Sequence, residues 1–184
     1  MARPVLALML VGALGLAACG GDDTTVTEKQ PAQKQPGGDL TGAGIGPVTQ
    51  GQSPAAVRKS FGTPDEQRRV PGCELSGPQK PKLEFVWHLE GGTLTLQFDD
   101  KDRFSSYRTT SPNLATESGS RVGDPFAGLR DSYGPTLRRL DVGAQSTPRA
   151  GFWYVGPSLD SAILFSIAGA KVRSISGGKI EICE

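Results

Sequence analysis

Two groups of side chains have the residue types that catalysis or metal binding needs. His88 is the single histidine of the 184-residue chain and stands in EFVWHLE, and an imidazole can act as a general base. The motif FDDKDRF places Asp99, Asp100 and Asp102 close together, and carboxylates are the oxygen ligands that calcium prefers. However, the sequence shows no G-x-S-x-G nucleophile motif, and the aspartates lack the glycine and distal glutamate of an EF-hand loop. We therefore expect a strand histidine, a polar hairpin turn, no metal or cofactor, and no enzymatic activity.

The amino-terminal segment has the pattern of a secretory signal peptide. Arg3 supplies a positive charge, and residues 5–14 form an uncharged apolar run of suitable length. This run is shorter than the roughly 20 apolar residues of a membrane-spanning helix. The alternative, a buried core helix, is disfavoured because residues 21–46 show no hydrophobic periodicity. We expect residues 1–18 to be a signal peptide and the protein to be exported.

The first cysteine follows that segment directly, in the sequence LAAC at residues 16–19. This sequence resembles the bacterial lipobox, in which a branched residue and two small residues precede the cysteine that becomes the mature amino terminus. The resemblance implies that Cys19 is lipidated and anchors the protein on the extracytoplasmic side of a bacterial membrane. A single acyl chain binds a membrane only marginally, so the two or three chains of such lipoproteins make the anchor stable. An ordinary signal peptide with a leftover thiol is the alternative.

The next segment, residues 19–44, is polar and rich in Gly, Gln, Thr and Pro. Such a composition cannot bury enough apolar surface to offset the entropy of ordering, so we expect a disordered tether. The formal net charge of the whole chain is +1. This balance argues against a nucleic-acid partner, because nucleic-acid binding needs an excess of basic groups that releases counterions.

We expect residues 45–184 to fold, and this part contains an internal similarity. GQSPAAVRKSFG at residues 51–62 aligns with GDPFAGLRDSYG at residues 123–134 without gaps. The similarity divides the folded part into a first repeat, residues 45–116, and a second, residues 117–184. Two related segments of this kind are typical of a duplicated structural unit.

Each of the two similar segments predicts a short helix with marked ends. In the first, Ser53 can cap the amino end and Pro54 can occupy the first helical position. In the second, Asp124 and Pro125 are expected to play the same parts. A glycine can end each helix in the left-handed conformation, and these glycines are Gly62 and Gly134.

Alternating apolar residues after each helix predict strands with one buried face. Leu83 and Phe85 in the first repeat correspond to Phe152 and Tyr154 in the second, and the alignment continues into the following strands. We therefore expect an α+β fold of two tandem half-repeats, each a short helix followed by an antiparallel meander of about three strands.

The helix motif also carries a resemblance to known families. The residues that match are Gly51, Ser53, Val57, Phe61, Gly62 and Pro64. Together with the meander, they resemble the repeat of the β-lactamase-inhibitor-protein-like fold and of small envelope lipoproteins of the BamE (SmpA/OmlA) type. The resemblance implies an α+β module that binds other proteins without catalysis. It transfers no binding loop to particular residues.

With Cys19 assigned to a lipid, Cys73 and Cys183 form an even pair outside the cytoplasm, where a disulfide is expected. A bridge that closes a loop of about 110 residues would stabilise the fold by roughly 4 to 5 kcal/mol in the chain-entropy model. A reactive or metal-binding pair is the alternative, but the sequence places no histidine close to either cysteine.

The aromatic run GFWYVG is the candidate partner-binding surface. Phe152 and Tyr154 lie on one face of the predicted strand, and Trp153 lies on the other. Trp153 and Tyr154 are residue types that often dominate binding energy at interfaces; a core strand packed on both faces is the alternative. The expected function is a non-catalytic protein-interaction or envelope-structural module, with another envelope or secreted protein as partner. A ligand-binding module or an inhibitor of a secreted enzyme is the second hypothesis.

Overall fold

The computed structural model describes residues 35–71, 81–141 and 151–180. Contacts divide the chain into two units, residues 1–31 and 32–184, and all described residues belong to the second. The elements of the second unit are, in chain order, β1 (Leu40–Thr41), β2 (Gly44–Ile45), β3 (Val48–Thr49), α1 (Pro54–Phe61), β4 (Glu66–Val70), β5 (Lys82–Leu89), β6 (Gly92–Phe98), β7 (Phe104–Thr109), α2 (Phe126–Tyr133), η2 (Gly134–Thr136), β8 (Arg138–Leu140), β9 (Gly151–Val155), η3 (Leu159–Ser161), β10 (Ala162–Ala168) and β11 (Lys171–Gly178). Among the described residues, neither α1 nor α2 has the length and apolar character of a membrane-spanning helix.

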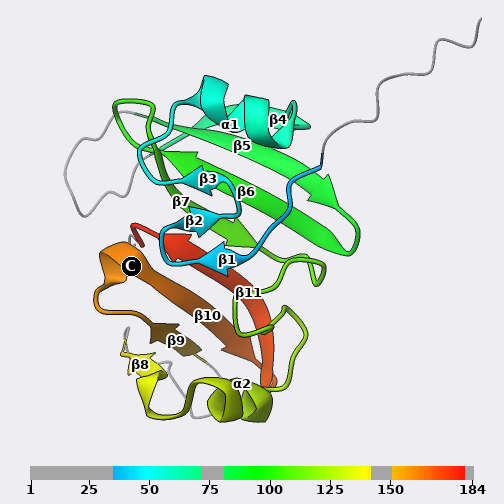
Figure 1. The fold of residues 1–184 in the computed structure, drawn as a ribbon, viewed down its shortest axis with the longest axis vertical. Helices are drawn as coiled ribbons and strands as arrows, with labels where there is room; N and C mark the ends of the chain where they lie inside the picture. Colours follow the sequence, from blue (N-terminus) through cyan, green and yellow to red (C-terminus); the bar gives the residue numbers. More distant parts are fainter. Residues whose placement is uncertain (1–34, 72–80, 142–150, 181–184) are drawn as a thin grey trace, which may run out of the picture. The chain divides into compact units, whose positions relative to one another are not determined.

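Strands dominate this part of the chain. Of the described residues, 46% lie in strands and 17% in helices. Eight strands form one antiparallel sheet in the order β4-β5-β6-β7-β11-β10-β9-β8, and β1, β2 and β3 form a separate small sheet (Figure 1). The two strand groups that follow α1 and α2 meet where β7 pairs with β11.

This architecture corrects the predicted fold class. The fold is mostly β, so the expected α+β arrangement of two tandem helix-plus-meander repeats is wrong. The strands that follow α1, β4 to β7, and those that follow α2, β8 to β11, belong to one continuous sheet instead of two separate repeats. The reason lies in hydrogen bonding: a sheet edge has unpaired N–H and C=O groups, and pairing β7 with β11 satisfies both inner edges.

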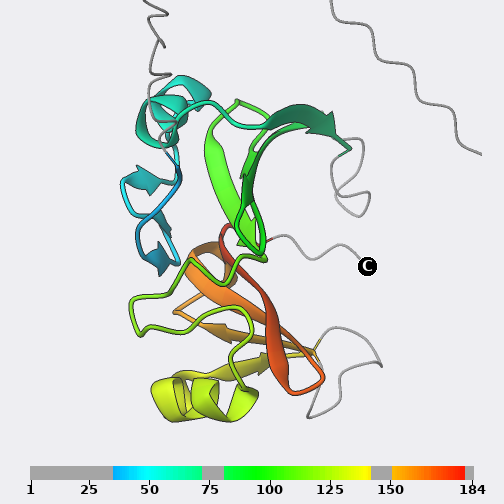
Figure 2. The ribbon, with the colours of Figure 1, turned by 90° about the vertical axis from the view of Figure 1, so that its right-hand side faces the viewer.

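The hydrophobic core lies on one face of the large sheet. Figure 2 shows α1 and the small sheet along this face. Aromatic rings fill the space below α1, where Phe85 lies 4.8 Å from Phe98 and 5.9 Å from Trp87 between ring centroids. Phe61 of α1 packs edge-on against Trp87. Such edge-to-face contacts stabilise the pairs beyond the area that they bury.

The small sheet is part of this core. Leu40, Ile45 and Val48 are fully buried, although residues 40–44 fall in the segment that the sequence assigned to the tether. Gly42 makes the close approach possible, because a Cβ atom there would overlap the carbonyl oxygen of Ser161. The ordered part of the chain therefore begins before residue 45.

Helix α1 begins and ends as predicted. Its amino end is capped by Ser53, whose side chain accepts a hydrogen bond from the Ala56 N–H at 3.4 Å, and Pro54 is the first helical residue. At the other end Gly62 has a positive φ of 83°, and its N–H donates to the Arg58 carbonyl at 2.8 Å. A positive φ favours glycine because it has no Cβ.

The predicted start of α2 is wrong. Pro125 occupies the N-cap position, and no side chain caps this helix. Asp124 instead accepts a hydrogen bond from the Arg121 N–H at 2.7 Å, which closes the preceding turn. An aspartate before a helix can bond backward to a turn or forward to the helix, and the sequence does not distinguish the two.

Candidate functional site

The face of the large sheet opposite the core is the candidate site. Side chains of directly paired residues share a face, so the register partners Arg68, Glu84, Gln97 and Ser106 lie together on this side. Figure 2 shows no described helix or strand over it. We call this surface the open face.

The open face is hollowed into a cavity of about 420 Å³. The residues that line it are mostly short or polar and come from seven of the eight strands and the segment after β11: Arg68, Glu84, Thr95, Gln97, Ser106, Tyr107, Arg108, Phe152, Leu164, Ser166, Ser174, Ser176, Lys179 and Ile180. A cavity of this size admits a few side chains of a partner or a small ligand.

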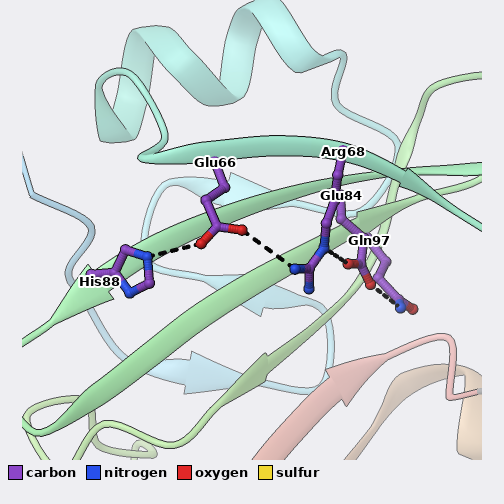
Figure 3. Close-up of polar contacts among 5 residues, drawn as sticks. All are labelled: Glu66, Arg68, Glu84, His88 and Gln97. Atoms are coloured by element: carbon purple, nitrogen blue, oxygen red, sulfur yellow. Dashed lines mark hydrogen bonds and ion pairs between the residues drawn. The ribbon is translucent and has the colours of Figure 1, made fainter.

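A buried carboxylate organises one side of the cavity (Figure 3). Glu84 is only 6% exposed. Its Oε2 accepts from the Arg68 Nε at 2.9 Å, and its Oε1 accepts from the Gln97 Nε2 at 2.7 Å. The hydrogen bond and the charge of Glu84 raise the pKa of the Arg68 guanidinium. Both carboxylate oxygens are thus satisfied, as a buried charge requires, and the network holds three strands in fixed register.

His88 lies beside this network, on β5. Its Nε2 is 3.1 Å from Glu66 Oε1, and its backbone N–H donates to Asp65 Oδ2 at 2.6 Å. The imidazole is exposed, and among the described residues Glu66 is its only side-chain hydrogen-bond partner. A histidine paired with one carboxylate can carry a proton, but a nucleophilic mechanism also needs a hydroxyl or thiol within hydrogen-bond reach. Both side chains of the pair are exposed, His88 by 59% and Glu66 by 45%.

The three aspartates of FDDKDRF lie at the hairpin between β6 and β7, as predicted. Asp99 Oδ1 accepts from the backbone N–H groups of Lys101 and Arg103 at 2.9 and 2.8 Å. Asp102 has a positive φ of 52° and pairs with Arg69. In the described ranges no group of three or more His, Cys, Asp or Glu side chains could hold a metal ion.

The aromatic run in β9 is divided between the two faces. The ring centroid of Trp153 lies 4.8 Å from that of Phe126 of α2, on the core side. Tyr154 faces the open side, where the Arg138 guanidinium lies 4.7 Å from its ring centroid. Phe152, also on the open side, is 37% exposed. The sequence alignment had matched Phe152 and Tyr154 to the buried residues Leu83 and Phe85. That match is wrong by one residue, because Trp153 faces the core instead.

Sequence reasoning missed Arg108 and Lys179, two of the three exposed cations that line the cavity. A signal was available for Arg108, because in FSSYRT the polar Ser106 and Arg108 alternate with buried Tyr107 and Thr109. No comparable pattern marks Lys179, which follows the last strand. The predicted lipidation residue Cys19 and the predicted disulfide pair Cys73 and Cys183 lie outside the described residues.

Comparison with known proteins gives no family. No protein-family model and no curated protein matches this chain. One solved structure, an extracellular protein containing an SCP domain from Bacillus anthracis str. Ames, is similar over 68% of this chain with 6% identity and a TM-score of 0.45. This chain spans 42% of that one.

Proposed function

We propose that this chain is a membrane-anchored lipoprotein whose folded part binds another envelope or secreted protein without catalysis. Cys19 is the proposed lipidation site, on the extracytoplasmic side of a bacterial membrane, and the open face is the proposed binding surface. The observation that carries the proposal is the contrast within one sheet: its core face packs into a cluster of buried hydrophobic residues, whereas its open face carries a cavity of about 420 Å³.

The side chains of the open face suit protein recognition. The Arg68–Glu84–Gln97 network fixes one wall before a partner arrives, which lowers the entropy cost of binding. Phe152 is the exposed large hydrophobic residue of the described part, and aromatic residues are enriched at interfaces. Of the two aromatic residues singled out from the sequence, only Tyr154 faces this surface.

Site-specific photocrosslinking in native membranes tests the binding surface. A photoreactive amino acid replaces Ser176 on the open face, and in a matched control it replaces exposed Ala55 on α1. We expect a reproducible crosslinked protein from position 176 and none from position 55. Equal labelling from both positions, or none from position 176, would contradict the proposal.

Mass spectrometry of the mature amino terminus tests the anchor. We expect an acylated Cys19 as the first residue, and a Cys19→Ala variant that is no longer processed to the lipidated form. An unmodified terminus elsewhere in the chain would rule out the lipoprotein assignment. This measurement does not depend on the partner.

We also propose a bridge between Cys73 and Cys183, which lie outside the described residues; the directions of the strands before them allow it. In the antiparallel sheet β4 and β11 are four steps apart, so they point the same way and are roughly 19 Å apart along the sheet. Cys73 follows Val70 by three residues and Cys183 follows Gly178 by five. Eight extended residues span up to about 27 Å, which is enough to close this distance. Non-reducing peptide mapping should link the two cysteines; two free thiols would disprove the bridge.

The cavity also supports a second candidate, a module that sequesters a ligand or inhibits a secreted enzyme. Its volume lies within the range of small-molecule sites. Crosslinking separates the two candidates, because a stable protein adduct favours the first. A small molecule that co-purifies with the native protein, and is lost when Ser176 is replaced by Trp, favours the second.

A further inference from the structure

We propose that the open face recognises an acidic extended segment of its partner, with Arg108 and Lys179 binding the carboxylates and Phe152 contacting an apolar side chain. The inference rests on the proposed function and adds the chemical class of the partner.

The first argument is the charge of the cavity. Three cationic side chains and one carboxylate line it, namely Arg68, Arg108, Lys179 and Glu84. Glu84 is already paired with Arg68, so no carboxylate of the cavity lining balances the charges of Arg108 and Lys179. Neither side chain has a hydrogen bond or ion pair with any residue that the structure describes. The cavity therefore presents an excess positive charge to whatever enters it.

The second argument is the position of Arg108. It lies on β7, in the middle of the sheet, and its register partners are Thr95 on β6 and Ser176 on β11. The side chains of both neighbours are short and end in hydroxyl groups, so the exposed guanidinium extends beyond them into the cavity. A guanidinium can bind a carboxylate through two parallel hydrogen bonds. The hydroxyl groups of Thr95 and Ser176, which also line the cavity, can add donors.

The third argument is the apolar side of the same cavity. Phe152 and Leu164 line it on β9 and β10. A ligand with carboxylates to pair with Arg108 and Lys179 and an apolar side chain to contact Phe152 has the chemistry of a short acidic peptide segment. Two cations are too few for the counterion release that drives nucleic-acid binding, and a hollowed surface does not fit the plane of a membrane.

Peptide titration with the full-length mature protein tests this inference. The probe is a fluorescein-labelled eight-residue peptide with three acidic residues and one phenylalanine, and its control has Asn and Gln in place of Asp and Glu. We expect the acidic peptide to bind at least tenfold more tightly by fluorescence anisotropy, with a preference that weakens as salt rises.

Charge-reversal variants locate the binding. Arg108→Glu and Lys179→Glu should each weaken the acidic peptide at least tenfold, whereas the matched variant Lys59→Glu on α1 should leave its affinity unchanged. All three residues are exposed, and circular dichroism verifies that each variant folds. Equal affinity for the two peptides, or full affinity in Arg108→Glu, would overturn the inference.

Further measurements test whether the chain's own carboxyl terminus or a second copy of the chain occupies the cavity. They also distinguish failure of this inference from failure of the proposed function. If replacing Glu181 and Glu184 by Gln tightens peptide binding tenfold, the chain's own carboxyl terminus occupies the cavity, and the inference is overturned. The same holds if sedimentation shows a dimer that Arg108→Glu dissociates. If crosslinking from Ser176 persists while the peptide preference is absent, the proposed function stands and only the acidic class fails.

Discussion

The two faces of the eight-stranded sheet are built from the same strands but from different side chains. On the core face, Phe85, Phe98 and Phe165 are fully buried. On the open face, the same strands β5, β6 and β10 carry Glu84, Gln97 and Ser166. Alternation along each strand keeps the two sets apart.

This difference separates the residues that hold the fold from those free to serve binding. Burial of aromatic rings supplies most of the stability on one side. The other side carries mostly polar side chains around a cavity that leaves room for a partner, and its buried carboxylate is satisfied within the sheet. Substitutions on the open face should therefore change binding more than stability. Substitutions on the core face should change stability more than binding.

The largest effect is expected from truncating an aromatic ring on the core face. Phe85→Ala removes a fully buried ring in contact with Trp87 and Phe98. We expect a loss of about 3 to 5 kcal/mol in the free energy of unfolding, from lost transfer energy and the cavity left behind. Urea denaturation followed by tryptophan fluorescence measures it.

Phe152→Ala is the matched control on the open face. This ring is 37% exposed, so its removal should change the free energy of unfolding by less than about 1 kcal/mol. The same change should weaken binding of the acidic peptide. If both variants lost the same stability, the conclusion that the core face stabilises the fold more than the open face would be wrong.

A smaller effect is expected from the buried carboxylate. Glu84→Ala leaves Gln97 Nε2 and Arg68 Nε without their acceptor. Because the Arg68 side chain is 54% exposed, water solvates it in the variant, and we expect a loss of only about 2 kcal/mol.

Glu66→Ala is the control for that change. Glu66 also pairs with Arg68, but its side chain is 45% exposed, and an exposed pair contributes about 0 to 1 kcal/mol. Chemical denaturation of both variants in parallel gives the comparison. An equal loss for the two glutamates would show that burial of Glu84 has no special role.

The ends of helix α1 were more predictable from the sequence than the register of strand β9. Helix α1 followed from Ser53, Pro54 and Gly62, because local hydrogen bonding and backbone conformation determine such ends. The register of β9 did not follow, since GFWYV is aromatic or apolar at every position after its glycine and offers no alternation.

The joining of the strands into one sheet was not predictable either. The pairing of Ile175 with Thr109 connects residues far apart in the chain, and no local pattern encodes such a pair. Leu40 was missed for another reason: glycines and a threonine surround it, which is the composition of a flexible linker. The open-face site depends on the same long-range pairing, so its cavity could not be derived from one sequence.

A still smaller effect than that of Glu84→Ala is expected from a buried hydroxyl on the core face. Tyr107 is 2% exposed, and its Oη donates to the Thr41 carbonyl at 2.9 Å, which ties β1 to the large sheet. Tyr107→Phe should cost about 1 kcal/mol at neutral pH, from the lost hydrogen bond.

This contribution should disappear at alkaline pH. Burial, with a smaller effect of nearby Tyr133, raises the pKa of Tyr107 above its ordinary value near 10. The folded protein then keeps a proton that the unfolded chain releases, so stability falls as pH rises above about 10. The Phe variant lacks this group, and its stability deficit relative to the unmodified protein should therefore shrink between about pH 10 and 11. Denaturation at a series of pH values measures the difference, with Tyr154→Phe on the open face as control; a deficit that stays constant would mean that water reaches the Tyr107 hydroxyl.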